Sequence, residues 1–144
     1  MLVLCGPYLE LWNEKGEILN SNHSALLETA KAIRRGKIVA VKGIGGFHLI
    51  VNANNPEAVR SLRHRKNREE KPFAVMFPNL AVIKESCEVS EIEQRLLTSP
   101  ESPIVLLKAK YPQILEFIAP NNPYLGVMLP YSPIHFLLMN ELNF

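Results

Sequence analysis

The sequence predicts an α/β fold built around a sheet of mixed strand direction. Short apolar segments rich in β-branched residues alternate with segments that carry helix start signals, which is the pattern of an α/β sheet. A hairpin signal near the N-terminus and several proline-containing turns favour a mixed sheet over a purely parallel one. The chain has 144 residues, which suits one domain with a core of its own.

Composition excludes several classes of protein. Hydrophobic residues make up 47% and charged residues 21%, as in ordinary globular proteins, and the net charge of +2 favours no particular partner. Cys5 and Cys87 lie far apart and outside any C-x-x-C pair, so we expect neither a disulfide framework nor a zinc site in this chain. We expect a cytoplasmic location, because the sequence shows no secretion signal and no apolar run of the roughly 18 residues that a membrane helix needs.

The N-terminal region predicts a hairpin followed by a helix. The partly alternating residues 8–12 and the strand-like residues 17–19 flank a turn signal, Asn13-Glu14-Lys15-Gly16. Residues 20–23 are polar and predict a linker. A helix with one apolar stripe then follows and ends at Gly36.

Apolar runs and capping signals predict the remaining elements. Residues 37–41 are apolar on both faces, which predicts a buried strand, and residues 47–51 predict the next strand after a glycine turn. Asn55-Pro56-Glu57 is a strong helix start, with a cap, a proline in the first turn and an acid near the positive end of the helix dipole. The further predicted elements are, in order, a strand over 73–77, a helix over 81–85, a capping-box helix over 91–97, a strand over 104–107, a mainly loop segment over 111–125, a strand over 126–129 and a helix from Ser132 to Leu138.

The glycine segment Gly43-Ile44-Gly45-Gly46 is the first candidate site. It lacks the third glycine of a dinucleotide fingerprint, and the sequence holds no Gly-Lys-Ser/Thr of a Walker motif. The segment predicts either a tight turn between strands or a stretch of bare backbone that a ligand can approach closely. Lys42 stands at the end of the preceding strand, where ligands of open α/β sheets usually bind.

A cluster of six cations is the second candidate site. Its members are Arg60, Arg63, Arg65, Lys66, Arg68 and Lys71, with the acids Glu69 and Glu70 among them. The cluster predicts either a solvated helix end, whose cations the helix dipole favours, or an anion site. Arginine binds phosphate through two parallel hydrogen bonds and lysine acts as a point charge, so Lys66, Arg68 and Lys71 could neutralise a polyphosphate without a P-loop.

His48 and His135 lie in apolar surroundings. Such a histidine is more often structural than a ligand or a base, and both interpretations stay open. No Ser-His-Asp constellation, paired-carboxylate pattern or H-E-x-x-H motif occurs, which argues against hydrolases.

Four segments together resemble a known domain. KGIGGFHL, RHRKNREEKPFAVM, SPIVLL and LGVMLPYSPIHFLL match, in order and spacing across about residues 37–138, the YrdC-like domain of HypF, which belongs to the YrdC/YciO family. The combination is specific, although no single segment is. The opening Cys5-Gly6-Pro7-Tyr8-Leu9 looks like the end of the zinc-finger region that precedes this domain. The resemblance divides the chain into a zinc-finger tail with a hairpin linker over residues 1–20 and a partial YrdC-like domain over 21–144.

The resemblance implies a fold and a chemistry. The implied fold is a YrdC-like twisted open sheet with a concave, positively charged surface. In nickel–iron hydrogenase maturation, HypF hydrolyses carbamoyl phosphate to carbamate, and its YrdC-like domain then makes carbamoyl-adenylate from ATP by nucleotidyl transfer, releasing pyrophosphate. A further domain passes the carbamoyl group to HypE. The expected cofactors are ATP and Mg²⁺, which together with fixed cations would stabilise charge on the phosphate oxygens.

The resemblance also assigns roles to residues of both candidate sites. Lys66 and Arg68 match the K-x-R motif that binds the triphosphate and the acyl group, so they are the expected catalytic residues, and Lys71 matches the K-P pair that follows. Gly46-Phe47-His48-Leu49 aligns with a T-x-Y-G-L-type loop, and its G-G-F-H-L form is that of the HypF branch. The expected nucleotide- and anion-binding residues are Lys42, Gly45, Gly46, Phe47, His48 and Lys71, and no metal-binding residue is expected.

The chain departs from the HypF pattern in two places. Glu69 follows Arg68 where HypF commonly has proline, which puts an acid beside the proposed anion site. The sequence also stops at Phe144, before the Ser-Gly-Asn motif for ATP, so we expect a C-terminally truncated domain. We expect the parent protein to be an enzyme and leave the activity of the isolated chain open. The alternatives are a double-stranded RNA-binding module that uses the basic cluster and a non-catalytic fragment.

Overall fold

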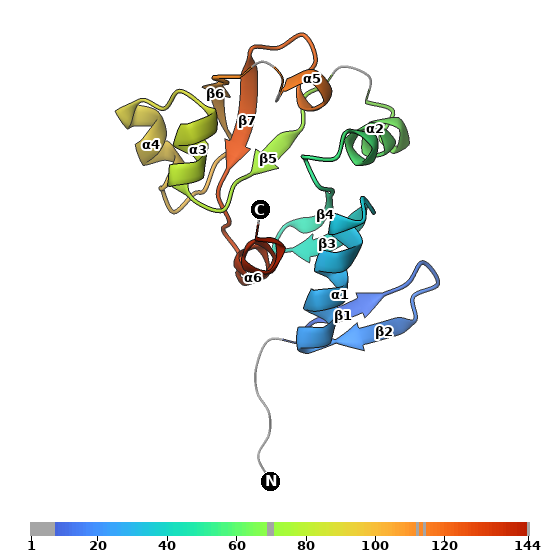
Figure 1. Ribbon diagram of the computed structural model, residues 1–144. Helices are drawn as coiled ribbons and strands as arrows, with labels where there is room; N and C mark the ends of the chain where they lie inside the picture. The colour runs from blue at the N-terminus through green and yellow to red at the C-terminus, as the bar shows by residue number, and fades with distance from the viewer. Residues whose placement is uncertain (1–7, 69–70, 112, 114, 144) are drawn as a thin grey trace.

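The structure is a computed structural model that describes residues 8–68, 71–111, 113 and 115–143. Helices and strands alternate along the chain, which confirms the predicted α/β class (Figure 1). The described strands form two antiparallel hairpins and one three-stranded sheet in place of a single continuous sheet. The three-stranded sheet has one parallel and one antiparallel pair, so its direction is mixed as predicted. The expected zinc-finger tail around Cys5 lies outside the described residues.

The N-terminal hairpin forms as predicted, but the linker after it does not. β1 (Glu10–Trp12) pairs antiparallel with β2 (Ile18–Ser21) around a turn in which Gly16 adopts a φ of 80°, a left-handed conformation that favours glycine. α1 (Asn22–Arg34) begins at the next residue. The backbone N–H of Asn22 donates to the carbonyl of Leu9 at 2.6 Å, so strand pairing continues up to the helix and leaves no linker.

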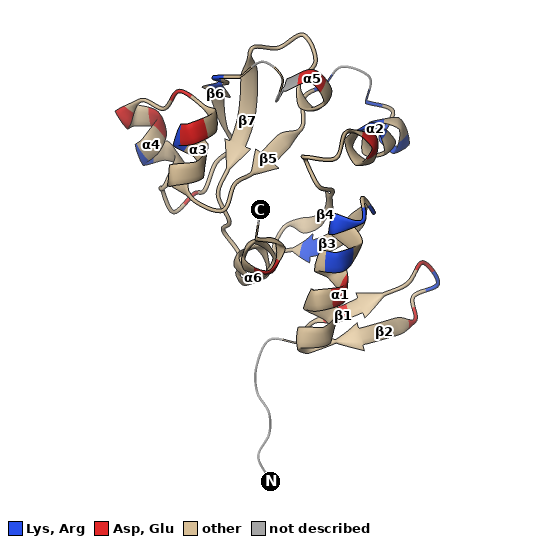
Figure 2. Ribbon diagram, viewed as in Figure 1, with Lys and Arg blue, Asp and Glu red and all other residues tan. Residues whose placement is uncertain are grey.

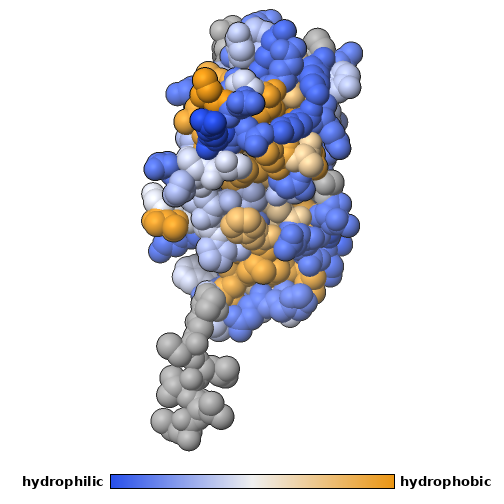
Figure 3. Space-filling model, turned by 90° about the vertical axis from the view of Figure 1, so that its left-hand side faces the viewer, coloured by the Kyte–Doolittle hydropathy of each residue, from blue (hydrophilic) through white to orange (hydrophobic). Residues whose placement is uncertain are grey.

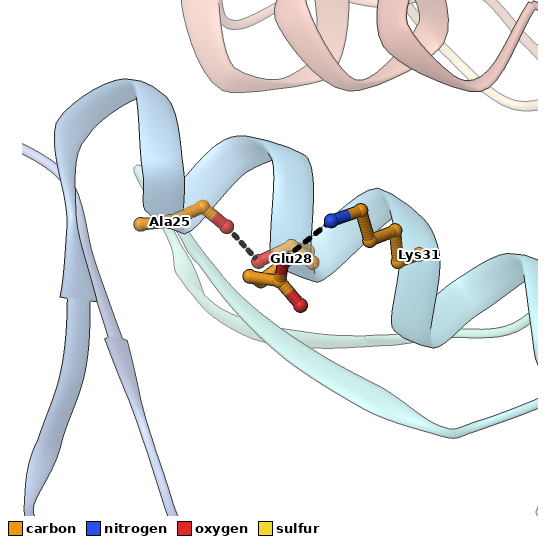
Figure 4. Close-up of polar contacts among 4 residues, drawn as sticks. Ala25, Glu28 and Lys31 are labelled. Atoms are coloured by element: carbon orange, nitrogen blue, oxygen red, sulfur yellow. Dashed lines mark hydrogen bonds and ion pairs between the residues drawn. The ribbon is translucent and has the colours of Figure 1, made fainter.

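α1 packs through one face and exposes the other. Of the predicted apolar stripe, Leu26, Ala30 and Ile33 are buried in a small core, whereas Leu27 is half-buried. Within the helix the Thr29 hydroxyl donates to the Ala25 carbonyl at 2.7 Å, which satisfies a buried polar group. On the exposed face Lys31 Nζ lies 2.6 Å from the carboxylate of Glu28, an ion pair one turn apart (Figure 4).

A second hairpin packs on α1 and on the last helix. β3 (Val39–Gly43) pairs antiparallel with β4 (Gly46–Ile50), and both contribute to the small core together with α6 (Pro133–Leu142). The prediction that the first of these strands is buried on both faces is wrong, because Val41 is buried whereas Ala40 and Lys42 are exposed. The two helices cover the same face of this hairpin, so burial alternates along each strand.

The three-stranded sheet holds the larger core. Its central strand, β7 (Tyr124–Met128), pairs parallel with β5 (Ala74–Met76) and antiparallel with β6 (Val105–Lys108). One face is covered by α3 (Leu80–Ser86) and α4 (Glu91–Leu97), seen beside the sheet in Figure 1. The largest fully buried side chains of this core are Ile83, Leu97, Leu107, Leu125 and Val127.

The opposite face of the three-stranded sheet is open. On β6, Leu107 is fully buried, whereas Leu106 is 61% exposed because it points away from α3 and α4. Figure 3 views the molecule from the other side, the left-hand side of Figure 1 where α3 and α4 lie, and shows apolar side chains among polar ones at that surface as well. The predicted strand is therefore present, but it is buried on one face and not on both.

The segment predicted as mainly loop contains one helical turn, α5 (Leu115–Ile118). Prolines on both sides of this segment favour loops, and a helix of one turn fits between them without needing a longer periodic pattern. The C-terminal end of α5 faces the start of β5, where the backbone N–H of Phe73 donates to the carbonyl of Ile118 at 2.9 Å.

α2 (Pro56–Arg65) begins as its capping signal predicts. The side-chain oxygen of Asn55 accepts hydrogen bonds from the backbone N–H groups of Glu57 and Ala58, both at 3.1 Å. Val59 and Leu62 are buried, so one side of the helix faces the core.

α2 ends in a Schellman motif that the K-x-R segment forms. The backbone N–H of Asn67 donates to the carbonyl of His64, and the N–H of Arg68 donates to the carbonyl of Arg63, each at 3.1 Å. Asn67 adopts a φ of 46°, the left-handed conformation that this motif requires just after a helix. Lys66 and Arg68 therefore flank a fixed backbone reversal.

Leu107→Ala should lower the free energy of unfolding by about 2–5 kcal/mol, because it leaves a cavity in the larger core. The matched control is Leu106→Ala on the same strand, which should change stability by no more than about 0.5 kcal/mol because that side chain is mostly exposed. Urea denaturation measures both. Equal losses for the two variants would contradict the one-sided burial of β6.

Asn67→Val should destabilise the protein by roughly 1–2 kcal/mol more than Asn67→Gly, because a β-branched residue resists the left-handed conformation whereas glycine adopts it freely. The Asn67 side chain is exposed, so both variants lose little packing. The comparison is made by denaturant midpoints, and equal midpoints would show that the left-handed backbone at this position carries no constraint.

Candidate functional site

The candidate site centres on the α2–β5 connection, defined as the described residues 66–68 and 71–73. It carries Lys66, Arg68 and Lys71, the cations that the sequence singles out, and the Schellman motif fixes the path of residues 66–68. Lys66 and Lys71 are exposed and Arg68 is half-buried. Figure 2 shows Lys and Arg gathered on α2 and at its C-terminal end. Glu69 and Glu70 lie outside the described residues.

Arg63 fastens this connection to the rest of the fold. Its Nη1 donates to the carbonyls of Arg68 at 2.9 Å and Lys71 at 3.0 Å. Its Nη2 donates to the carbonyls of Phe117 at 2.8 Å and Ile118 at 3.1 Å, which belong to the end of α5. Burial, followed by the nearby charge of Arg68, lowers the pKa of Arg63, but a guanidinium stays protonated in proteins.

Aromatic rings orient the arginines of this surface. The guanidinium carbon of Arg63 lies 4.6 Å from the ring centre of Phe73, and that of Arg68 lies 5.6 Å from the same ring. Arg60, one turn earlier on α2, lies 4.8 Å from the ring centre of Phe117. Stacking on a ring holds a guanidinium plane while leaving its edge open to a ligand.

These side chains line a shallow hollow of about 630 Å³, bounded by Arg60, Arg63, His64, Asn67 and Arg68. Three guanidinium groups bound it, and that of Arg63 already donates to four carbonyls, so those of Arg60 and Arg68 are the ones suited to bind an anion. Arginine can bind phosphate oxygens in pairs. The structure thus has the concave, positively charged surface that the resemblance implies.

The glycine hairpin forms the other candidate site. Lys42 and Phe47 are paired residues of β3 and β4, so their side chains share one face of the hairpin, and Phe47 is 69% exposed on it. A Cβ added at Gly45 would meet no atom within 4 Å, which leaves its backbone open to approach. Gly46 adopts a φ of 134°, a conformation that side chains rarely adopt.

His48 lies on the opposite face of the hairpin from Phe47, because side chains alternate along β4. Its ring stacks on that of His135 with centroids 5.8 Å apart, and Tyr131 meets the His135 ring edge-on at 4.6 Å. His135 is 1% exposed, and neither of its ring nitrogens has a hydrogen-bond partner among the described residues. His48 therefore does not share the face of the hairpin that carries Lys42 and Phe47, so it would not contact a ligand bound to that face directly.

The predicted site residues fall into two groups. Lys66, Arg68 and Lys71 share the α2–β5 connection, and Lys42, Gly45, Gly46 and Phe47 share the glycine hairpin. No hydrogen bond or ion pair links the two groups within the part of the chain that the structure describes. The same residues contain no group of three His, Cys, Asp or Glu side chains that could hold a metal ion.

Arg63 stands among the predicted cations, but charge density alone does not distinguish its role. Its position in the sequence does carry a signal, because it follows the apolar Leu62 and lies four residues after the apolar Val59. Both of these residues are buried, so Arg63 lies beside the buried face of α2. Cys87 is buried in the larger core, and that burial raises the pKa of its thiol.

The His48–His135 pair should make stability depend on pH. Burial, then the nearby His48, lowers the pKa of His135 below its ordinary 6.5, so the unfolded chain takes up a proton at a pH where the folded chain does not. The free energy of unfolding should therefore be highest above pH 6.5 and should decrease as the pH falls below that value. His135→Phe should reduce this slope in urea titrations between about pH 5 and 8.

The control for the pH experiment is His23→Phe at the exposed start of α1, which should keep the wild-type slope. If His135→Phe also kept it, the buried imidazole would not be the source of the pH dependence.

Comparison with known proteins places these features in a family. The sequence model of the Sua5/YciO/YrdC family, described as "Telomere recombination", matches residues 31–144. The carbamoyltransferase HypF of Synechocystis is 47% identical over 136 residues, which cover 94% of this chain and 18% of that protein. The chain thus spans less than a fifth of the length of this relative.

Solved structures agree with the sequence match. The full-length HypF structure in the phosphate- and nucleotide-bound form superposes with a TM-score of 0.79 at 55% identity, covering 83% of this chain and 19% of that one. The HypF of T. kodakarensis gives a TM-score of 0.87 at 40% identity, covering 95% of this chain and 18% of that one. With its family match and its similarity to HypF over most of its length, the chain belongs to the Sua5/YciO/YrdC family as a HypF-type domain.

Proposed function

We propose that this domain provides the adenylate-forming site of a HypF-type carbamoyltransferase. The reaction joins ATP and carbamate, which other parts of such a protein make from carbamoyl phosphate. A carbamate oxygen bonds to the α-phosphorus of ATP, the bond from that phosphorus to the β-phosphate oxygen breaks, and pyrophosphate leaves. Carbamoyl-adenylate results, and its carbamoyl group goes on to HypE. The relatives' name, carbamoyltransferase, supports the class of reaction.

The observation that carries the proposal is the set of oriented cations around the α2–β5 connection. Lys66, Arg68 and Lys71 would bind the triphosphate, since phosphoryl transfer depends on positioning and on neutralising charge on the phosphate oxygens. A nucleotide occupies one of the superposed HypF structures, according to its description, and the present hollow has the charge to hold phosphates. Arg68, which already lies against the Phe73 ring, would lose little freedom on binding.

The glycine hairpin would serve the same ligand from another side. Lys42 would add a further positive charge, while the bare backbone at Gly45 and Gly46 permits close approach. Phe47 would offer an exposed apolar surface beside Lys42, and His48 would support the hairpin from its packed face.

Magnesium enters the proposal with the nucleotide. Because the described residues hold no group of three metal-ligating side chains, Mg²⁺ would come bound to the phosphates of ATP. When bound there it would neutralise part of their charge. The side chains of this domain would then hold the remaining phosphate oxygens.

The double-stranded RNA alternative uses the same cations. A groove for a duplex needs phosphate contacts spread along a surface, whereas the guanidinium groups of Arg60, Arg63 and Arg68 gather at one hollow. The nucleotide proposal therefore has the better structural support.

ATP with magnesium should bind the chain in isothermal titration, and Lys66→Ala and Arg68→Ala should each weaken that binding by about tenfold or more. This follows because a hydrogen bond to a charged group is worth about 1.5–3 kcal/mol and about 1.4 kcal/mol is tenfold. The matched control is Lys15→Ala, an exposed lysine in the turn of the β1–β2 hairpin, which should leave the affinity unchanged. ATP–pyrophosphate exchange in a full-length protein with this domain tests the chemistry itself.

Absence of ATP binding by the wild-type chain, or undiminished binding by both alanine variants, would remove the basis of the proposal.

A further inference from the structure

Arg63 differs from the other cations of the basic cluster in what it contacts. Lys66 and Lys71 are exposed, whereas Arg63 is half-buried and gives hydrogen bonds to four backbone carbonyls. Two of these carbonyls belong to the α2–β5 connection and two to the end of α5. The planar guanidinium thus joins two segments that lie about 50 residues apart in the sequence, as the separations of 54 and 55 residues to Phe117 and Ile118 show.

The carbonyls at the end of α5 need such a partner. The last carbonyls of a helix receive no hydrogen bond from an N–H group of the same helix, and α5 is a single turn. Ile118 also accepts from the backbone N–H of Phe73, so the α5 end, Arg63 and the start of β5 meet at one point. This junction fixes the far end of the α2–β5 connection.

Arg68 is held by Arg63 on both of its backbone polar groups. Its N–H donates to the Arg63 carbonyl at 3.1 Å, and its carbonyl accepts from Arg63 Nη1 at 2.9 Å. Both guanidiniums also face the ring of Phe73, with Arg63 the closer of the two. The Arg68 guanidinium makes no hydrogen bond to another described residue, so its donors are available to a ligand.

We propose that Arg63 is a positioning residue of the nucleotide site, a role that rests on the function proposed above. By binding the carbonyls of Arg68 and Lys71 with one nitrogen, it sets the separation of these two cations. By binding α5 with the other nitrogen, it holds both against the sheet. Arg68 and Lys71 then reach neighbouring phosphates of the same polyphosphate, while Arg63 itself does not touch it.

Lysine cannot replace Arg63 in this role. The ammonium group is a single point with three donors, whereas the guanidinium fork sends parallel donors to two separate segments. Arg63→Lys keeps the net charge and shortens the side chain by about one atom, so a loss of binding by a folded variant reports the lost guanidinium geometry and not a lost charge.

The test compares Arg63→Lys with Arg34→Lys in the full chain. Arg34 at the end of α1 also donates to backbone carbonyls, those of Glu141 and Leu142 at the end of α6, but it lies outside both groups of candidate site residues. Affinities for ATP and for AMP are measured by isothermal titration, and folding is checked by denaturant midpoints. We expect Arg63→Lys to weaken ATP binding by at least about tenfold with little change for AMP, because only a polyphosphate needs the two cations at a set spacing. Arg34→Lys should leave the ratio of the two affinities unchanged.

A second readout does not depend on any nucleotide. In hydrogen exchange, Arg63→Lys should speed exchange at the backbone N–H groups of Arg68 and Phe73, while the larger core around Leu107 keeps its protection. If Arg63→Lys did not fold, Arg63→Gln, whose amide can still donate to one of the two segments, would be measured in the same way with the same criteria.

The outcomes separate the two proposals. A wild-type chain that binds no ATP would overturn the proposed function. A wild-type chain that prefers ATP, together with an Arg63→Lys variant whose ATP-to-AMP ratio equals that of Arg34→Lys, would overturn the positioning role and leave the function standing. Equal loss for ATP and AMP would also overturn it, because general destabilisation affects both ligands alike.

Discussion

The end of α2 is the constraint on which the candidate site depends. A helix must find partners for its last carbonyls, and here the chain does so by reversing at Asn67. The reversal fixes Lys66 and Arg68 on either side of one residue, so the spacing of a K-x-R motif follows from helix termination. Arg63 adds side-chain hydrogen bonds to the same turn and connects it to α5. Helix capping and the placement of these two cations therefore depend on the same contacts.

Local signals predicted much of this fold because their causes are local. The Asn55 cap and the capping box of Ser90 and Glu93 each involve residues within one turn, so the sequence contains the whole interaction. Burial was harder to predict, because whether Ala40 is covered depends on helices far away in the sequence. The apolar composition of β3 and β6 suggested two covered faces, and each strand has one.

The candidate site divides in a similar way. The cations of the α2–β5 connection were identified from charge density and resemblance, both of which are visible in the sequence. Arg63 was not singled out, because its four carbonyl partners come from tertiary structure and carry no side-chain signature. The side-chain direction of His48 follows from alternation along β4, which turns it away from the face of Phe47. On that opposite face the structure places His48 against His135.

The parallel pairing of β5 with β7 has a consequence for how the domain folds. Ala74 lies opposite Gly126, so this pairing closes a loop of about 50 residues, whereas the β1–β2 and β3–β4 hairpins close over a few residues. Local hairpins form early and long-range pairings pay a larger closure entropy, so the sheet with β5 should form late. The α2–β5 connection leads directly into β5. An early folding intermediate would then have both hairpins in place while its principal cations are still unordered.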